Sequence, residues 1–258
     1  MKVSLVTAVL NRVTTLGDTL TSILEQSYKD IECIVIDGGS TDGTVELIKD
    51  YQSKFGERLK WISESDNGLF DAMNKGLRMA SGDIVAIINS DDYYHRTDII
   101  ELIVNTFESD EKVQAVYGDV RFVSRHNVSK VVRYYSSSVF TPKKFKYGFM
   151  PAHPTFFTYL KYYKKWGMFR TDMPTSADFD LLLRFLYSHK LQAKYIRTEF
   201  MTMRTGGMSY PSFSNTRQVN REVRKICKEN RIKTNYLLLY SRYLKKIFEW
   251  MPSLYKKQ

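Results

Sequence analysis

Apolar, β-branched runs alternate with amphipathic stretches over the first 90 residues, and this alternation constrains the fold more than any other feature of the chain. Apolar runs that are typical of buried strands occupy residues 3–10, 31–36, 59–63 and 84–88. Between them apolar residues recur at helical spacing, as at Leu16, Leu20 and Ile23. The order β-α-β-α-β-α-β predicts an α/β fold, with a mostly parallel central sheet flanked by helices.

The second half of the chain has a different pattern. Residues 113–117, 120–124 and 128–135 alternate apolar and polar side chains or run short, as antiparallel strands do. A helical pattern at 177–187 and a strand pattern at 193–203 follow. We therefore expect antiparallel pairing to extend the parallel sheet.

Positive charge is concentrated at the C-terminal end. The net charge is +11, and residues 216–258 contribute +9 of it, from 12 Lys/Arg and 3 Glu. The preceding 215 residues are nearly neutral. We therefore divide the chain into a folded domain at 1–215, with halves at 1–110 and 111–215, and a basic helical tail at 216–258.

Aromatic and apolar residues recur in this tail at roughly helical spacing, from Tyr236 to Met251. A basic helix of this kind fits the surface of an anionic membrane. The alternative is a helix that packs its apolar face on the body of the protein and leaves its lysines in solvent. Nucleic-acid binding is not expected, because the tail matches no recognition module.

Cysteine content and the N-terminal sequence predict the compartment. Cys33 and Cys227 are the two cysteines, too few for a disulfide framework, which favours a reducing environment. The N-terminus turns polar at Asn11, too early for a signal peptide, and no uninterrupted apolar stretch approaches the roughly 18 residues of a membrane span. We expect a cytoplasmic protein, peripheral at the inner face of the cytoplasmic membrane.

The run at 84–88 leads directly into Asn89-Ser90-Asp91-Asp92. Ligands of α/β sheets gather outside the carboxyl ends of the strands. Two adjacent carboxylates repel each other there, and one takes up a proton unless a cation compensates. Oxygen ligands suit Mg²⁺ or Mn²⁺, so Asp91 and Asp92 are candidate metal ligands. The alternative is a solvated loop that leads into the next helix.

Polar residues follow the other predicted strands as well. Residues 7–11 end the first strand, Asp37 and two glycines end the second, and Asp66 lies in a turn after the third. An acidic residue at a strand end can accept hydrogen bonds from a base N–H or from ribose hydroxyls. Each segment alone also reads as a plain turn, but parallel strands bring all of them to one edge of the sheet.

With these motifs in place, the chain resembles the family 2 glycosyltransferases, which have the GT-A nucleotide-diphospho-sugar transferase fold. The resemblance runs from Val3 to about Ser209. It rests on VTAVLNR at 6–12, IDGGSTDGT at 36–44, ESDNGLFDAMNKG at 64–76 and NSDD at 89–92. The sequence looks closest to bacterial members that build O-antigen, capsule or other exopolysaccharide chains.

The resemblance implies roles for individual residues in binding the nucleotide sugar. Thr7, Val9 and Asp37 would line the nucleobase pocket, with Asn11 beside them. Asp66 would lie beside the base and Lys75 would face the nucleotide. Asp91 would meet the ribose or the metal, and Asp92 would coordinate the metal that bridges the diphosphate.

In this family, a carboxylate at the start of a later helix is the catalytic base. The segment SADFDLLLR at 176–184 matches that helix and makes Asp178 the candidate. Family members usually have Glu before this Asp, and this chain has Ala177. Without the resemblance, Asp178 also reads as a helix N-cap or a first-turn acid that the helix dipole favours. Asp180 is predicted to be structural.

Two further segments have open interpretations. Residues 204–209 form a basic, glycine-containing loop that could close over the diphosphate, with Arg204 pairing a phosphate oxygen, or could be an ordinary connector. His153 could contact the acceptor or a phosphate, or could be a buried structural residue.

Together these observations predict an inverting, Mn²⁺- or Mg²⁺-dependent glycosyltransferase. The expected donor is a nucleotide sugar, specifically a UDP-sugar, and the expected acceptor is a lipid-linked oligosaccharide. Diphosphate departure needs a compensating cation, and the incoming hydroxyl needs a base. Two alternatives remain. One is a sugar nucleotidyltransferase, although residues 11–14 are not a Gly-rich phosphate loop. The other is a non-catalytic nucleotide- or sugar-binding protein of the same fold.

Overall fold

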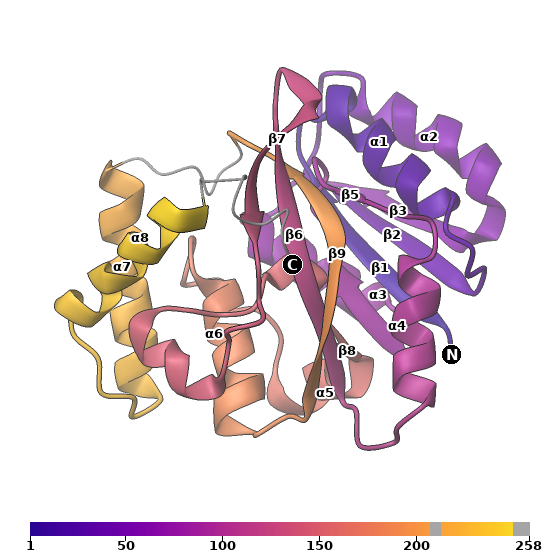
Figure 1. Ribbon diagram of the computed structural model, residues 1–258. Coiled ribbons are helices and arrows are strands. Elements are labelled where there is room, and N and C mark those ends of the chain that lie inside the picture. The colour runs from indigo at the N-terminus through magenta and orange to yellow at the C-terminus, as the bar shows by residue number, and fades with distance from the viewer. Residues whose placement is uncertain (207–212, 250–258) are drawn as a thin grey trace.

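The computed structural model describes residues 1–206 and 213–249, with side chains described for 1–206 and 216–243. Within these residues the strands join into one nine-stranded sheet, with helices on both of its faces (Figure 1).

The first half of the chain forms the parallel part of the sheet. Its strands are β1 (Val3–Val9), β2 (Ile31–Asp37), β3 (Leu59–Ser63) and β4 (Ile84–Ile87), in the spatial order β3-β2-β1-β4. The helices between them are α1 (Val13–Leu24), α2 (Thr44–Phe55) and α3 (Leu69–Met79). The predicted parallel sheet is therefore confirmed, with boundaries close to those expected from the apolar runs.

Strand burial explains why these runs are continuously apolar. Val6 and Ile36 point into a core shared with α3, whereas Leu5 and Val35 point into a second core shared with α1, α2 and α4 (Ile99–Glu108). Since helices cover both faces, both sets of alternating side chains must be apolar.

The second half extends the sheet beyond β4. β8 (Phe157–Tyr159) pairs antiparallel with β4 and with β6 (Ala115–Ser124). β6 also pairs antiparallel with β7 (Asn127–Tyr135) and parallel with β9 (Ala193–Arg204), and β9 pairs antiparallel with β5 (Tyr93–Tyr94). The remaining helices here are α5 (Leu160–Trp166) and α6 (Ala177–Leu183), which continues as one π-helical turn over Arg184–Ser188. Short 3₁₀ turns occupy Gly56–Arg58, Pro142–Tyr147 and His153–Thr155.

One expectation for this half was wrong in detail. Residues 115–117 and 120–124, expected in two separate strands, belong to a single strand, β6, whose pairing with β9 shifts around Gly118. A Cβ on Gly118 would lie 2.7 Å from the ring of Phe200 and 2.7 Å from the carbonyl oxygen of Thr198. The glycine interrupts the apolar pattern because β9 approaches it too closely for any side chain.

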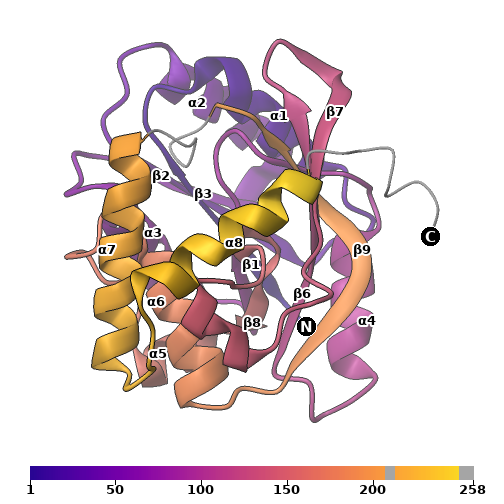
Figure 2. The same cartoon turned by 60° about the vertical axis from the view of Figure 1, so that its left-hand side comes forward.

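The basic C-terminal segment folds into α7 (Phe213–Glu229) and α8 (Tyr236–Glu249). Figure 2 shows both helices on the side of the molecule where α6 lies. Val223, Ile226 and Cys227 of α7 and Leu239 of α8 are buried in the core that also contains α6. These residues therefore pack on the body of the protein, as in the alternative in which the tail turns its apolar face to the body. Within the described residues, no helix combines the length and the apolar composition needed to cross a membrane.

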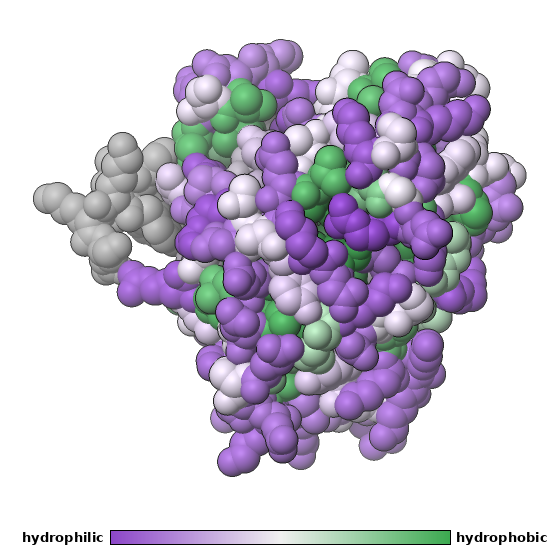
Figure 3. All heavy atoms as spheres, turned by 90° about the vertical axis from the view of Figure 1, so that its right-hand side faces the viewer, coloured by the Kyte–Doolittle hydropathy of each residue, from purple (hydrophilic) through white to green (hydrophobic). Residues whose placement is uncertain are grey.

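The opposite side of the molecule, at the right of Figure 1, is mainly hydrophilic, with apolar residues in small separate groups (Figure 3). Helices α1, α2 and α4 on that side turn their apolar faces inward and their polar faces to solvent.

Candidate active site

The carboxyl ends of β1, β2 and β3 meet at one edge of the sheet. Val9 is in register with Asp37, and Asp37 with Ser63. Asp37 is fully buried, and its carboxylate accepts hydrogen bonds from the backbone of Gly39 (3.1 Å) and Ser40 (3.0 Å) and from the Ser63 hydroxyl (2.6 Å). The carboxylate therefore shapes the loop that follows β2, and Ser63, which sequence reasoning missed, shares in holding it.

Asn11 joins the loop after β1 to the loop after β2. Its backbone N–H donates to the Ser40 hydroxyl (2.7 Å), and its side-chain oxygen accepts from the backbone of Thr41 (2.9 Å). Asn11 adopts a left-handed backbone conformation, with φ of 51°, which asparagine tolerates better than most residues. The structure thus brings Asn11 and Asp37 together, as predicted from parallel strand ends.

Asp66 reaches the same edge because Gly38 has no side chain. A Cβ on Gly38 would lie 2.6 Å from a carboxylate oxygen of Asp66, so the Asp66 side chain would have to move to make room for it. Lys75 on α3 donates to the carbonyl of Ser65 (2.9 Å) and pairs with Glu64 (2.7 Å), a contact that raises the pKa of Lys75. Lys75 is therefore held close to the Asp66 turn.

Thr7 and Val9 lie within β1 and are buried, so they support the floor of this edge. The Thr7 hydroxyl has no hydrogen-bond partner among the described residues. Leu10, the next residue after the strand, is 52% exposed and lies beside Gly38. An exposed leucine at a strand end is a candidate contact for a flat nucleobase, and the sequence pattern did not single it out.

Asp91 and Asp92 follow β4 at the same edge. Asp92 is buried, and one of its carboxylate oxygens accepts from the Asn89 side chain (2.8 Å). Burial, together with the charge of Asp91, raises the pKa of Asp92 well above its usual range. The loop is tied to α1 by hydrogen bonds from Thr15 to the Ser90 carbonyl (3.0 Å) and from Thr19 to the Asp92 carbonyl (2.7 Å).

This pair fits a divalent cation. A buried carboxylate whose charge is penalised by burial and by a neighbouring carboxylate gains most from a bound cation. Among the described residues, no group of three or more His, Cys, Asp or Glu is arranged to hold a metal. Asp91 and Asp92 would therefore supply only part of a coordination shell, and a bound diphosphate is the natural source of further oxygen ligands.

Arg204 lies at this site but is not a free loop residue, which corrects one expectation. It is the last residue of β9, and its guanidinium donates to the Asp91 carbonyl (2.6 Å) and pairs with Asp18 of α1. Its positive charge also acts to lower the pKa of Asp92. Residues 207–209 of the predicted lid lie outside the described residues.

Asp178 lies on the first turn of α6, in the other half of the domain. It is partly buried, and its carboxylate accepts from the backbone N–H of Phe179 (2.7 Å). Burial raises the pKa of Asp178 to about 6, and the charge of Glu222 on α7 adds to this effect. A carboxylate with such a pKa is ionised at neutral pH and still accepts a proton readily, as a general base must.

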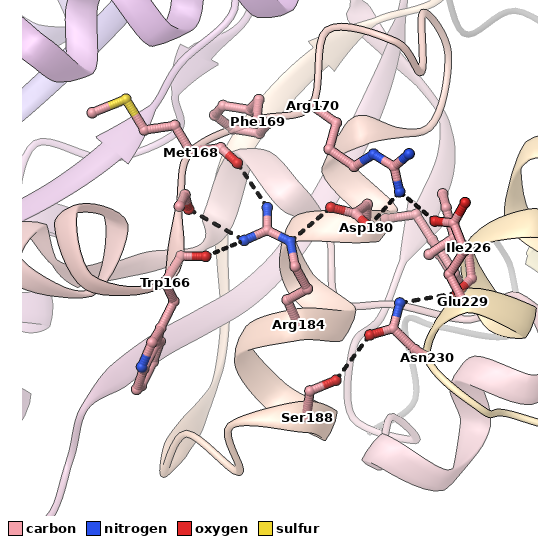
Figure 4. A network of polar contacts seen from close by, with 12 residues as sticks. Trp166, Met168, Phe169, Arg170, Asp180, Arg184, Ser188, Ile226, Glu229 and Asn230 are labelled. Carbon is pink, nitrogen blue, oxygen red and sulfur yellow. Dashed lines mark hydrogen bonds and ion pairs between the residues drawn. The ribbon is translucent and has the colours of Figure 1, made fainter.

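A polar network holds α6 in place (Figure 4). Arg184 pairs with the buried Asp180 (2.7 Å) and donates to the carbonyls of Trp166 (2.7 Å) and Met168 (2.7 Å). Arg170 lies 3.7 Å from Asp180 and also pairs with Glu229 of α7. Asp180 thus has the contacts of a structural ion pair.

The turn that Arg184 holds also touches the donor half. The side chain of Asn74 on α3 donates to the Phe169 carbonyl (2.8 Å) and accepts from its N–H (2.9 Å). Asn74 is a polar residue on the apolar face of α3, and this break in the pattern is the signal that could have identified it. The contacts from Asn74 through residues 166–169 to Arg184 link the helix that carries Lys75 to the helix that carries Asp178.

His153 belongs to this packing. It is buried, its ring packs edge-on against Phe169 at 5.4 Å, and burial lowers its pKa to about 4. The side chain is therefore neutral at physiological pH. His153 has the contacts of a buried structural residue, the second of the two interpretations.

Comparisons with known proteins show which family this sequence is similar to. Residues 4–167 match the family described as Glycosyl transferase family 2. A PGL/p-HBAD biosynthesis glycosyltransferase of Mycobacterium bovis is 33% identical over 117 residues, which are 45% of this chain and 46% of that protein. The matched part therefore spans less than half of that relative. An uncharacterized glycosyltransferase of Mycobacterium tuberculosis is 29% identical over 214 residues, 81% of this chain and 79% of that protein.

Solved structures share the fold at low sequence identity. TarS of S. aureus (residues 1–349, in complex with UDP) has a TM-score of 0.64 and 17% identity, over 88% of this chain and 65% of that chain. The mannosyltransferase PcManGT of Pyrobaculum calidifontis, in complex with GDP-Man and Mn²⁺, has a TM-score of 0.64 and 19% identity, over 92% of this chain and 66% of that chain.

Proposed function

Because this chain belongs to glycosyl transferase family 2, we propose that it transfers a sugar from a nucleotide-diphosphate sugar to an acceptor hydroxyl, with inversion at the anomeric carbon and with the help of Mn²⁺ or Mg²⁺. The observation that carries the proposal is the meeting of three features at one edge of the sheet. These are the Asn11–Asp37 loops, the Asp66 turn beside Lys75, and the Asp91–Asp92 pair.

The donor site would lie along the carboxyl ends of β1 to β4. Asp37, Asp66 and Leu10 would contact the nucleoside, and Lys75 would stand beside it. TarS binds UDP and UDP-GlcNAc, and PcManGT binds GDP-Man, so relatives of this fold accept both uracil and guanine nucleotides. We propose a UDP-sugar for this chain.

The metal would be held by Asp91 and Asp92, where its charge would neutralise the departing diphosphate. The protein's own part is to keep these two carboxylates together, with Asp92 buried and Asp91 partly exposed. Thr15 and Thr19 bind the loop, and Arg204 holds the Asp91 carbonyl. Because Asp92 is buried, its carboxylate loses the stabilisation that water would give, and a bound cation would compensate for this loss.

Asp178 would remove the proton from the attacking acceptor hydroxyl. A sugar hydroxyl is a weak acid, so a carboxylate within hydrogen-bond reach is needed as the new bond forms. One base on the acceptor side and a diphosphate leaving group on the other define a single displacement, which inverts the anomeric centre. Two flanking carboxylates, as in a glycosidase, are not required.

The nucleotide site is tested first, by calorimetric titration of the full chain with UDP, GDP and dTDP, each with and without Mn²⁺. We expect UDP to bind, and to bind more tightly when Mn²⁺ is present. Binding of none of the three to a sample with a cooperative thermal transition would contradict the proposal. It would favour a protein that keeps the fold without this activity.

We further propose that the acceptor is a lipid-linked oligosaccharide at the inner face of the cytoplasmic membrane, in cell-surface polysaccharide synthesis. Although Leu239 of α8 is buried against the body, Leu237 is 81% exposed, Tyr236 45% and Tyr240 44%. Exposed Arg231 and Lys233 precede them in the chain. An exposed apolar helix face with nearby cations suits an anionic lipid surface.

Binding to vesicles tests this docking. Leu237→Glu should weaken co-sedimentation with phosphatidylglycerol-containing phosphatidylcholine vesicles by about 10-fold or more, because it removes an apolar anchor and adds repulsion. Val128→Glu, at an equally apolar and 46% exposed position of β7, is the matched control and should bind as the parent chain does. Equal loss in both variants, or in neither, would refute docking through α8.

A further inference from the structure

Glu222 is a buried carboxylate in the segment that composition sets apart as a basic tail. It lies on α7 and is 8% exposed. Its carboxylate accepts from the backbone N–H of Thr175 (3.1 Å), from the Thr175 hydroxyl (2.8 Å) and from the Gln218 side chain (3.1 Å). Within the described residues, no Lys or Arg forms an ion pair with it at 4.0 Å or less. Burial of a carboxylate without an ion-pair partner is costly unless hydrogen bonds compensate, and most of those to Glu222 come from Thr175.

The residue that Glu222 holds leads directly into α6. Thr175 precedes Ser176, and the Ser176 carbonyl accepts the first hydrogen bond of the helix, from Asp180 N–H (3.0 Å). Asp178 lies between Ser176 and Asp180, in the first turn of α6. A shift of Thr175 would therefore move the turn on which Asp178 stands.

We propose that Glu222 is a positioning residue for Asp178. Through Glu222, helix α7 anchors the turn that leads into α6, and this turn places Asp178 in the active site. The inference rests on the proposed function, in which Asp178 is the base. It gives the C-terminal helical segment a role in catalysis that is separate from membrane docking.

The charge of Glu222 has a second consequence. Burial is the main cause that raises the pKa of Asp178, and the charge of Glu222 raises it further, because a second negative charge nearby disfavours ionisation. Asp180, on the same helix, is already paired with Arg184 and lies beside Arg170. Glutamine at position 222 could accept the same hydrogen bonds from Thr175 without the charge, so the anchoring and the electrostatic effect can be separated by mutation.

The first variant, Glu222→Gln, removes the charge and keeps an acceptor. The measurement is a carbon NMR titration of the full chain with ¹³C-labelled aspartate, in which the Asp178 carboxyl is assigned by its loss in Asp178→Asn. We expect the midpoint of the Asp178 titration to fall by about 0.5 to 1 pH unit. Glu229→Gln, on the same helix where Glu229 pairs with Arg170, is the control and should leave that midpoint unchanged.

The second variant, Thr175→Val, keeps the charge and removes one of the two bonds to Glu222. We expect hydrogen exchange at the Asp180 and Leu181 amides to become about 5-fold faster, as the loss of one hydrogen bond predicts. Unchanged exchange in Thr175→Val, or an unchanged Asp178 midpoint in a folded Glu222→Gln protein, would overturn the proposal. Neither measurement requires turnover, so a failure here is distinct from failure of the proposed transferase activity.

Discussion

Replacing Asp178 by Asn is expected to lower kcat by about 10²- to 10⁴-fold while the affinity for the donor nucleotide stays within about 2-fold of the parent value. The amide has almost the same shape as the carboxylate but cannot take up the hydroxyl proton. Asp178 lies on α6 in the acceptor half and is not one of the residues that would bind the nucleotide. The effect should therefore fall on the chemical step.

Turnover and nucleotide binding are measured on the same sample, by nucleoside-diphosphate release and by calorimetry. Asp50→Asn, at an exposed aspartate of α2, is the matched control and should change neither. Because the pKa of Asp178 is raised to about 6, kcat/KM of the parent chain should rise with pH through this value, as the base loses its proton. A large loss of donor affinity in Asp178→Asn would instead place Asp178 in the nucleotide site.

Replacing Asp92 by Asn is expected to abolish the strengthening of nucleotide binding by Mn²⁺, a loss of at least about 100-fold in affinity for the metal. Removal of even an indirect metal contact costs 10- to 100-fold in other sites, and Asp92 would be a direct ligand. The amide retains the volume and a hydrogen-bonding oxygen for Asn89. Metal-dependent turnover should be lost with it.

The same substitution should stabilise the metal-free protein. The pKa of Asp92 is higher in the folded chain than in the unfolded one, so its contribution to folded stability is greatest below pH 4 and is lost as the pH rises through the folded-state value. At neutral pH, Asp92→Asn should therefore raise the melting temperature by about 2–4 °C for each kcal/mol by which burial and the charge of Asp91 destabilise the ionised carboxylate. At pH 4 the difference should disappear.

Asp98→Asn is the control for both effects, because Asp98 is half-exposed and pairs with Arg96 at the surface. Calorimetry with and without Mn²⁺ measures the effect on metal and nucleotide binding, and thermal melting at the two pH values measures the effect on stability. If Asp92→Asn bound nucleotide and Mn²⁺ as the parent does, Asp92 would not be a metal ligand. If its melting temperature fell at neutral pH, the carboxylate would instead be a stabilising structural group.

The parallel half of the fold could be predicted from sequence because its signals are local. Apolar runs such as 31–36 and 84–88 are buried on both faces, and a chain of β-branched residues with helices between them has few other ways to fold. The site edge followed from the same logic. Asp37 is the last residue of a parallel strand, and Asn11 and Asp91 lie in the loops that follow two others. Parallel strands end at one side of the sheet.

Contacts between distant segments could not be predicted in this way. Arg204 looked like a loop cation in the sequence, but the fold sets it against Asp18 and the Asp91 carbonyl, more than 100 residues away. Asn74 and Phe169, 95 residues apart, meet for the same reason. Nothing in the local pattern specifies these pairs, because they depend on how packed helices and strands happen to face each other.

The sequence by itself determined the order of the strands and helices in the first half, the family motifs and the residue types at the strand ends, because periodicity and turn chemistry act over a few neighbouring residues. The tertiary structure alone decided that α7 belongs to the core and that Glu222 reaches Thr175 beside Asp178. Net charge distinguished this segment as a tail, but the burial of Val223 and Ile226 depends on a complementary apolar surface around α6. That surface exists only once the whole chain has folded.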